Sequence, residues 1–194
     1  MSKLFTIVIF ILTIVSQVRA QDQYSRGEVF GGYSYASTQV RQYTSRTHTN
    51  GWAAGITGNI FKHFGIMADI AGGYGQVWLG DGYSDLRLYE FLFGPQITWR
   101  TGRFNASVHA LAGMAHFSSS EIPLHPEPGF PAPQPLPGIA ETHFAAGLGG
   151  AVDVSVNKRV AIRAFQLDYI PVRTHPWTHN VRVQAGLVLR FGFR

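Results

Sequence analysis

The 194-residue chain has no cysteine, few charged residues and no long apolar segment, and each absence narrows its class. Without cysteine no disulfide contributes to stability, which must therefore come from the fold itself. Charged residues make up 14% of the chain, well below the roughly one quarter that is typical of soluble domains. A helical membrane protein is excluded, because no apolar run reaches the ~18 residues that a spanning helix needs.

The first 20 residues have the pattern of a signal peptide. Lys3 precedes an apolar segment at residues 4–15 that is too short to span a membrane, and Val18 and Ala20 are the small residues expected before a cleavage site. We therefore expect an exported protein of 194 − 20 = 174 residues. Removing one lysine and one arginine with this segment lowers the formal net charge from +5 to +3, too little to argue for a nucleic-acid partner.

Apolar and polar residues alternate along the last segment, residues 179–194. Every second residue from Val181 to Phe193 is apolar, and the residues between them are mostly polar or small. A strand places alternate side chains on opposite faces. The pattern continues for about 13 residues, more than the ~9–11 that a tilted strand needs to cross a bilayer. It predicts a membrane-spanning strand with one apolar face.

Seven further segments alternate in the same way. They are residues 27–37, 51–60, 64–74, 86–100, 103–117, 142–156 and 159–172. In the last of these the polar set changes parity near Ala164, which predicts a one-residue bulge. Pro95 lies inside the fourth segment and cannot donate to a ladder, so a bulge is predicted there as well.

The connections between these segments alternate between long and short. Residues 38–50, 75–85, 118–141 and 173–179 form long or polar loops, and the other three connections are turns of about two to four residues. Seven of the ten prolines lie in the third loop, which we expect to be partly extended polyproline II. This arrangement predicts an all-β fold, an eight-stranded antiparallel up-and-down transmembrane β-barrel with its long loops outside the cell.

The strand faces give two further predictions. Tyr89 and Trp99 lie ten residues apart on one apolar face, the spacing of two aromatic girdles at the lipid–water boundaries. Charged residues on the opposite faces point into the barrel and are expected to pair in one hydrogen-bonded network. These residues are Glu28, Asp69, Glu90, Asp153, Arg163, Asp168, Arg182 and Arg190.

Two motifs give the chain a family resemblance. Residues 28–35 read EVFGGYSY, and Gln184, Gly186, Leu189 and Phe191 form a polar-x-Gly-x-x-apolar-x-aromatic pattern. Over the whole mature length the chain resembles the OmpA-like eight-stranded outer-membrane β-barrel family. The resemblance implies an outer-membrane location, lipid contact, and recognition of the terminal pattern by the outer-membrane insertion machinery during assembly. It implies no cofactor.

The leading functional hypothesis is a structural or surface-interaction role carried by the loops. Loop 118–141 is either a binding site for a surface partner or a disordered loop without a binding role. A narrow pore lined by the inward charges is an alternative, although opposed charges favour a plug. A soluble periplasmic lipocalin-like barrel, with its apolar faces turned inward, is another.

An enzyme is the fourth reading of the sequence. Five histidines are expected at or near the outer rim, with Asp81 and residues 118–120 in the same region; they are His109, His116, His143, His175 and His179. A nucleophile and its base must lie within hydrogen-bond reach, and no spacing here indicates a catalytic triad or a metal site. We therefore expect no catalytic, cofactor or metal site.

Overall fold

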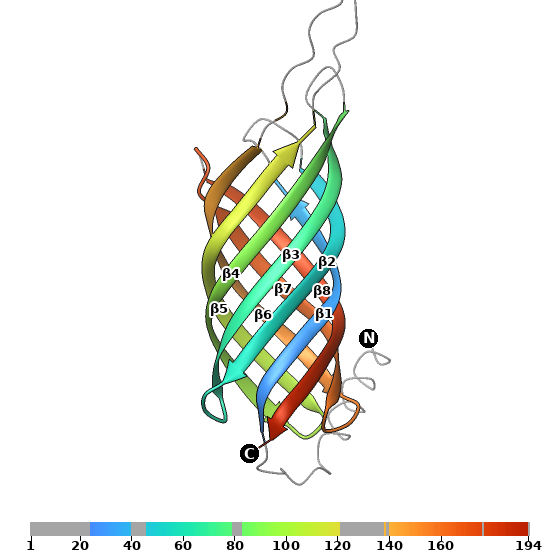
Figure 1. Ribbon diagram of the computed structural model, residues 1–194, viewed down its shortest axis with the longest axis vertical. Coiled ribbons are helices and arrows are strands. Elements are labelled where there is room, and N and C mark those ends of the chain that lie inside the picture. Colours follow the sequence, from blue (N-terminus) through green and yellow to red (C-terminus); the bar gives the residue numbers. More distant parts are fainter. Residues whose placement is uncertain are drawn as a thin grey trace, which may run out of the picture.

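The computed structural model describes residues 24–39, 46–78, 83–120, 138, 140–175 and 177–193. These residues form eight antiparallel strands, each paired with its neighbours in the chain, and β1 pairs with β8 to close the barrel (Figure 1). The strands are β1 (Ser25–Thr38), β2 (Thr47–Asn59), β3 (Phe64–Trp78), β4 (Tyr83–Thr101), β5 (Phe104–Ser119), β6 (Ala140–Ser155), β7 (Val160–Val172) and β8 (Thr178–Phe193). The predicted fold class is confirmed.

Within the described ranges, no helix has the length and apolar character needed to cross a membrane. The predicted signal peptide lies outside these ranges, and so does most of loop 118–141.

Three short connections gather at one end of the barrel, which we call the turn end. They join β2 to β3, β4 to β5 and β6 to β7. Gly102 adopts a φ of 58° in the two-residue turn between β4 and β5, a conformation that glycine adopts without steric cost. In the β6–β7 turn the Asn157 side chain accepts hydrogen bonds from the backbone of Arg159 and Val160, both at 2.8 Å. We call the opposite end, where the other connections lie, the loop end.

At the loop end the strands continue further than the sequence predicts. Residues 47–50, assigned to a loop, pair with Tyr35–Thr38 in β1. The β3–β4 hairpin likewise extends through the predicted loop 75–85 until Trp78 pairs with Tyr83. Alternation of apolar residues marks only the part of a strand that has an apolar face. Backbone hydrogen bonds do not require such a face, so the ladder continues beyond the point where the alternation ends.

The two predicted bulges have different outcomes. On β7 the pairing register shifts between Arg163 and Gln166, and both Ala164 and Phe165 face outward, so this bulge is confirmed. The bulge at Pro95 was wrong, because β4 pairs with β3 in one unbroken register. On the β5 side the paired positions stop at Phe93 and resume at Gln96 in the same register. The ladder therefore tolerates the missing donor by local loss of pairing.

Large apolar side chains cover the outside of the barrel, and polar side chains fill much of its inside. Along β4, exposed and buried residues alternate almost without a break from Tyr83 to Trp99. Exposed side chains in the middle of the outer face include Ile56, Phe91, Phe93, Leu148, Leu167 and Leu187. This is the outward apolar band of a transmembrane barrel. The lipocalin-like alternative was wrong, because it requires the apolar faces to point inward.

Two glycines face each other in the ladder between β1 and β8 that closes the barrel. Gly32 on β1 lies opposite Gly186 on β8. A Cβ atom at Gly186 would overlap the carbonyl oxygen of Gly31, and one at Gly32 would overlap the carbonyl oxygen of Ala185. Both obstacles are backbone atoms of the closing ladder, so neither gives way by a change of rotamer.

We expect Gly186→Ala to lower the free energy of unfolding by about 1–3 kcal/mol, because the added methyl group pushes β1 and β8 apart. Gly31→Ala is the matched control, since a Cβ atom there meets nothing within 4 Å. The measurement is urea unfolding of the purified barrel in lipid vesicles, followed by tryptophan fluorescence. Equal stability of the two variants would contradict a packing role. A defect confined to assembly in cells would assign Gly186 to recognition by the insertion machinery instead.

Candidate functional site: a filled lumen between two polar ends

Arg182 crosses the lumen from β8 to three carboxylates on three other strands. Its guanidinium nitrogens lie 2.5 Å from Asp69 Oδ1, 2.9 Å from Glu90 Oε2 and 2.9 Å from Asp168 Oδ2. All four residues are at most 3% exposed. We call them the central cluster. Because buried charges are costly unless they are paired and hydrogen-bonded, this cluster ties β8 to β3, β4 and β7 across the lumen.

Further polar side chains complete the central cluster. His109 Nε2 lies 2.7 Å from Asp168 Oδ1, and Gln166 donates to Asp168 Oδ2 at 2.9 Å. With its carboxamide oxygen turned toward Arg182, Gln184 accepts from the guanidinium at 3.0 and 3.2 Å. The single guanidinium of Arg182 is therefore held on several sides.

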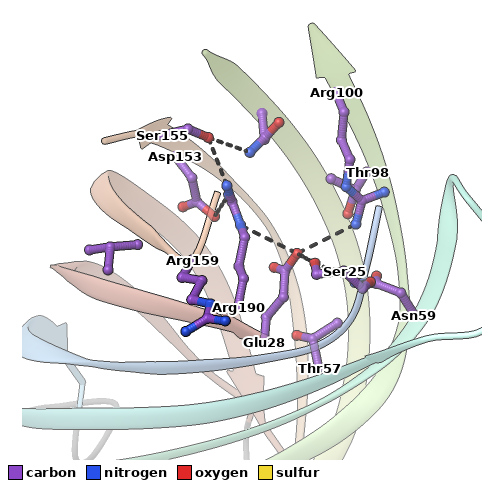
Figure 2. A network of polar contacts seen from close by, with 12 residues as sticks. Ser25, Glu28, Thr57, Asn59, Thr98, Arg100, Asp153, Ser155, Arg159 and Arg190 are labelled. Atoms are coloured by element: carbon purple, nitrogen blue, oxygen red, sulfur yellow. Dashed lines mark hydrogen bonds and ion pairs between the residues drawn. The ribbon is translucent and has the colours of Figure 1, made fainter. Parts of the chain in front are cut away.

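A second group of ion pairs, the turn-end cluster, lies closer to the turns (Figure 2). Glu28 Oε1 lies 3.5 Å from Arg100 Nη2 and 3.6 Å from Arg190 Nε. Arg190 also donates to Ser155 Oγ at 2.7 Å and lies 3.9 Å from Asp153 Oδ2. Here three arginines (Arg100, Arg190 and, as described next, Arg163) share two carboxylates.

Arg163 connects the two clusters. It donates to both oxygens of Asp153, at 2.8 and 3.3 Å, and to Gln166 Oε1 at 2.6 Å. Its guanidinium carbon also lies 4.5 Å from the centroid of the Phe30 ring, a cation–π contact. Polar contacts therefore run without interruption from Glu28 at the turn end to Arg182 in the centre.

The structure places all eight predicted network residues inside the barrel, and each takes part in an ion pair with another of the eight. The eight predicted residues did not include Gln166, His109 or Arg100, the last of which was expected on the inward face near a rim. Arg100 and Gln166 stand on the inward parity of their strands, so that parity is the signal that identifies them.

An apolar group fills the lumen on the loop-end side of the ion pairs. Leu86, Leu88 and Phe117 point inward near the loop ends of β4 and β5, and Ile170 and Val172 do so on β7. All are at most 7% exposed. These side chains were not predicted to close the lumen, because the prediction concerned only the charged inward residues and leucine carries no charge.

Hydrogen-bonded pairs lie on the outer face near the loop end, with at least one on each of the four hairpins that point that way. Tyr35 contacts His48 at 2.8 Å, Tyr74 contacts Tyr89 at 3.4 Å, His116 contacts Thr142 at 2.8 Å and Tyr169 contacts His179 at 2.5 Å. Trp99 is 49% exposed near the opposite end of β4. Tyr89 and Trp99 thus lie on the outer face near opposite ends, where girdle residues belong.

Four of the five predicted rim histidines lie near the loop end; they are His116, His143, His175 and His179. His109 was misplaced by the prediction: it lies midway along β5, has the parity of inward Asn105 and is 3% exposed. His116 and His179 belong to the outer pairs, and His143 lies 3.0 Å from Glu141. Asp81 lies outside the described residues. Among the described residues, no group of three or more potential ligands is arranged to hold a metal ion.

The four residues of the predicted insertion pattern divide between the two faces. Gln184 and Gly186 have inward parity, whereas Leu189 and Phe191 are 53% and 51% exposed on the outside. Their recognition by the insertion machinery stays a prediction.

We expect Arg182→Met to lower the free energy of unfolding by about 3–5 kcal/mol, because three buried carboxylates then face one another without their cation. Adding Asp69→Asn and Glu90→Gln to this variant should restore much of the loss. Arg103→Met, at an exposed turn position, is the control and should change stability by no more than about 0.5 kcal/mol. Urea titration in vesicles measures all three. A single variant as stable as the wild type would show that the cluster is not needed for stability.

Comparison with known proteins finds similarity in structure only. No family model matches the chain, and no curated protein matches its sequence. Neisserial surface protein A shares 13% identity over 86% of this chain and 98% of its own, with a TM-score of 0.61. Ail of Yersinia pestis, in complex with the heparin analogue sucrose octasulfate, shares 15% over 84% and 97%, with a TM-score of 0.57. The outer membrane protein OprG of Pseudomonas aeruginosa shares 13% over 87% and 97%, with a TM-score of 0.55.

At identities this low, the structural similarity demonstrates a common fold and nothing finer. The closed eight-stranded ladder, the outward apolar band and the polar lumen are the features that fit a bacterial outer membrane. The chain therefore has the fold of the eight-stranded outer-membrane β-barrels.

Proposed function

We propose that this protein is a closed outer-membrane barrel that presents its loop end to a partner at the cell surface. The observation that carries the proposal is the filled lumen. Arg182 and its three carboxylates span the barrel, and the group around Leu88 and Phe117 fills the space beyond them. A lumen filled in this way leaves the ends of the barrel as the places where a partner can bind.

A pore is the alternative reading of the same inward charges. An eight-stranded interior is just wide enough to be filled by its own side chains. Ions would have to separate Arg182 from three carboxylates and displace the apolar group as well. We therefore favour the plug, with a structural role for the charges.

We expect the purified barrel to show no stepwise ion conductance in planar lipid bilayers. The same preparation must show the faster gel migration of a folded barrel when it is not boiled, so that a silent bilayer is not the result of unfolded protein. Reproducible conductance steps that disappear in Glu90→Gln or Arg182→Met would contradict the plug and establish the pore.

The loop end is proposed to face outward. The turns at the other end are short, which is the usual arrangement on the periplasmic side of such barrels. β8 ends at Phe193, beside the start of β1, also at the turn end. Loop 118–141, which the sequence suggested as a working part, adjoins β5 and β6 at the loop end but lies mostly outside the described residues.

A basic patch at the loop end indicates the chemistry of a partner. It consists of Arg46, Arg173, His175 and His179, all exposed and brought together by the ends of β2, β7 and β8. Arg46 is held in place by hydrogen bonds to Ser37 Oγ at 3.0 Å and to the His179 carbonyl at 3.0 Å. A fixed guanidinium suits sulfate and carboxylate groups. Since one solved neighbour binds a heparin analogue, we propose an anionic saccharide as the partner.

We expect intact cells that display the barrel to bind fluorescent heparin, a polymer too large to cross the outer membrane. Arg46→Gln combined with Arg173→Gln should lower binding at least several-fold, because two cations of the patch are lost. Arg103→Gln with Lys158→Gln, at the turn end, is the matched control and should bind like the wild type.

Heparin binding that is unchanged in the loop-end variant would contradict the saccharide proposal. Binding by the purified barrel that Arg46→Gln with Arg173→Gln lowers, without binding by intact cells, would instead show that the loop end faces the periplasm.

A further inference from the structure

Exposed cations occupy every connection at the turn end. Lys62 lies in the β2–β3 turn, Arg103 in the β4–β5 turn, and Lys158 and Arg159 in the β6–β7 turn. Arg26 adds an outward-facing cation near the start of β1. We call these five residues the turn-end ring, because they come from all sides of the barrel.

The exposed surface of the turn end carries no carboxylate within the described part of the chain. Five of the seven described acidic residues point into the lumen, and the other two, Asp85 and Glu141, are exposed at the loop end. The lumen near the turns adds to the imbalance, since three arginines there share Glu28 and Asp153. Figure 2 shows Arg159 of the ring beside this cluster. Over the described residues, the turn end is therefore positive both inside and outside.

Aromatic residues on the outer face fix the depth of the turn-end ring. Phe64, Trp99, Phe104 and Phe191 are 38–51% exposed near the turn ends of their strands. Such side chains sit at the level where hydrocarbon gives way to headgroups. Lys62 and Arg103 stand two residues and one residue beyond Phe64 and Phe104, on the turn side, and therefore lie at the depth of the lipid phosphates.

We propose that the turn-end ring binds the headgroups of anionic phospholipids in the leaflet that surrounds it. Headgroups encircle a barrel, as the ring does, whereas a protein or a single polymer strand would meet cations on one side only. Each cation close to an anionic membrane surface contributes a severalfold attraction at physiological salt. The ring lies opposite the loop-end patch, so the proposal does not rest on saccharide binding or on which end faces the cell exterior.

The test measures lipid selectivity at the barrel surface. The wild-type barrel is reconstituted in phosphatidylcholine vesicles that contain spin-labelled phosphatidylglycerol or spin-labelled phosphatidylcholine, and the motionally restricted fraction is compared by electron paramagnetic resonance. We expect a severalfold preference for phosphatidylglycerol, which falls as the salt concentration rises because the ring is exposed to solvent.

The fourfold variant K62Q/R103Q/K158Q/R159Q, which keeps only Arg26 of the ring, should remove most of this preference. The charge-preserving exchange K62R/R103K/K158R/R159K should retain it. The loop-end control R46Q/R87Q/R173Q should retain it as well; Arg87 is an exposed residue of β4 near the loop end. Faster gel migration without boiling verifies that each variant is folded.

Equal restriction of the two lipids by the wild type would overturn the proposal. So would a loop-end variant that loses the preference as fully as the turn-end variant. If the fourfold glutamine variant does not fold, the pairs R103Q/K158Q and K62Q/R159Q replace it, and each should lose part of the preference.

Discussion

The filled lumen depends on the ion pairs that Arg182 makes with three buried carboxylates. A closed ladder satisfies the backbone in a membrane, but it also encloses the inward side chains, including carboxylates from β3, β4 and β7. Without a cation these groups would be buried and unpaired, at a cost of several kcal/mol. One guanidinium pairs with all three and joins opposite walls, so the barrel is braced through its centre as well as around its circumference.

Charge is distributed unevenly along the barrel because the clusters are not individually neutral. Three carboxylates surround one arginine in the centre, whereas three arginines share two carboxylates near the turns. Arg163 and Gln166 connect the two groups. Over the whole lumen, five carboxylates and four guanidinium groups nearly balance. Only at the turn end does the positive charge inside combine with a ring of exposed cations.

The low identity with other barrels follows from what this fold requires. An outward position needs an apolar side chain and an inward position needs one that fits and is paired, but neither needs a particular residue. Neisserial surface protein A therefore shares the fold at 13% identity. Particular residues matter where backbones meet, as at Gly186, and at the ends of the barrel, where we propose that charge selects the ligand. The functional proposals accordingly rest on the ends and on the lumen of this chain.

Much of the fold was determined by the sequence, because alternation along a strand reports directly which face meets lipid. It predicted the eight strands, the inward charges and the bulge after Arg163, all of which depend on local parity. The bulge predicted at Pro95 was wrong, because the ladder accommodates the missing backbone N–H donor without a change of register. The strand ends at the loop end were also missed, because polar residues leave no apolar pattern to follow.

The pairing of side chains was decided by the tertiary structure alone. Arg182 meets Asp69 across 113 residues of sequence and Glu90 across 92. Strand parity indicates that these side chains point inward, but their heights along the axis depend on the stagger between strands. That stagger also places His109 beside Asp168 in the centre and leucines beyond the ion pairs. Closure of the ladder fixes it, and no local stretch of sequence carries that information.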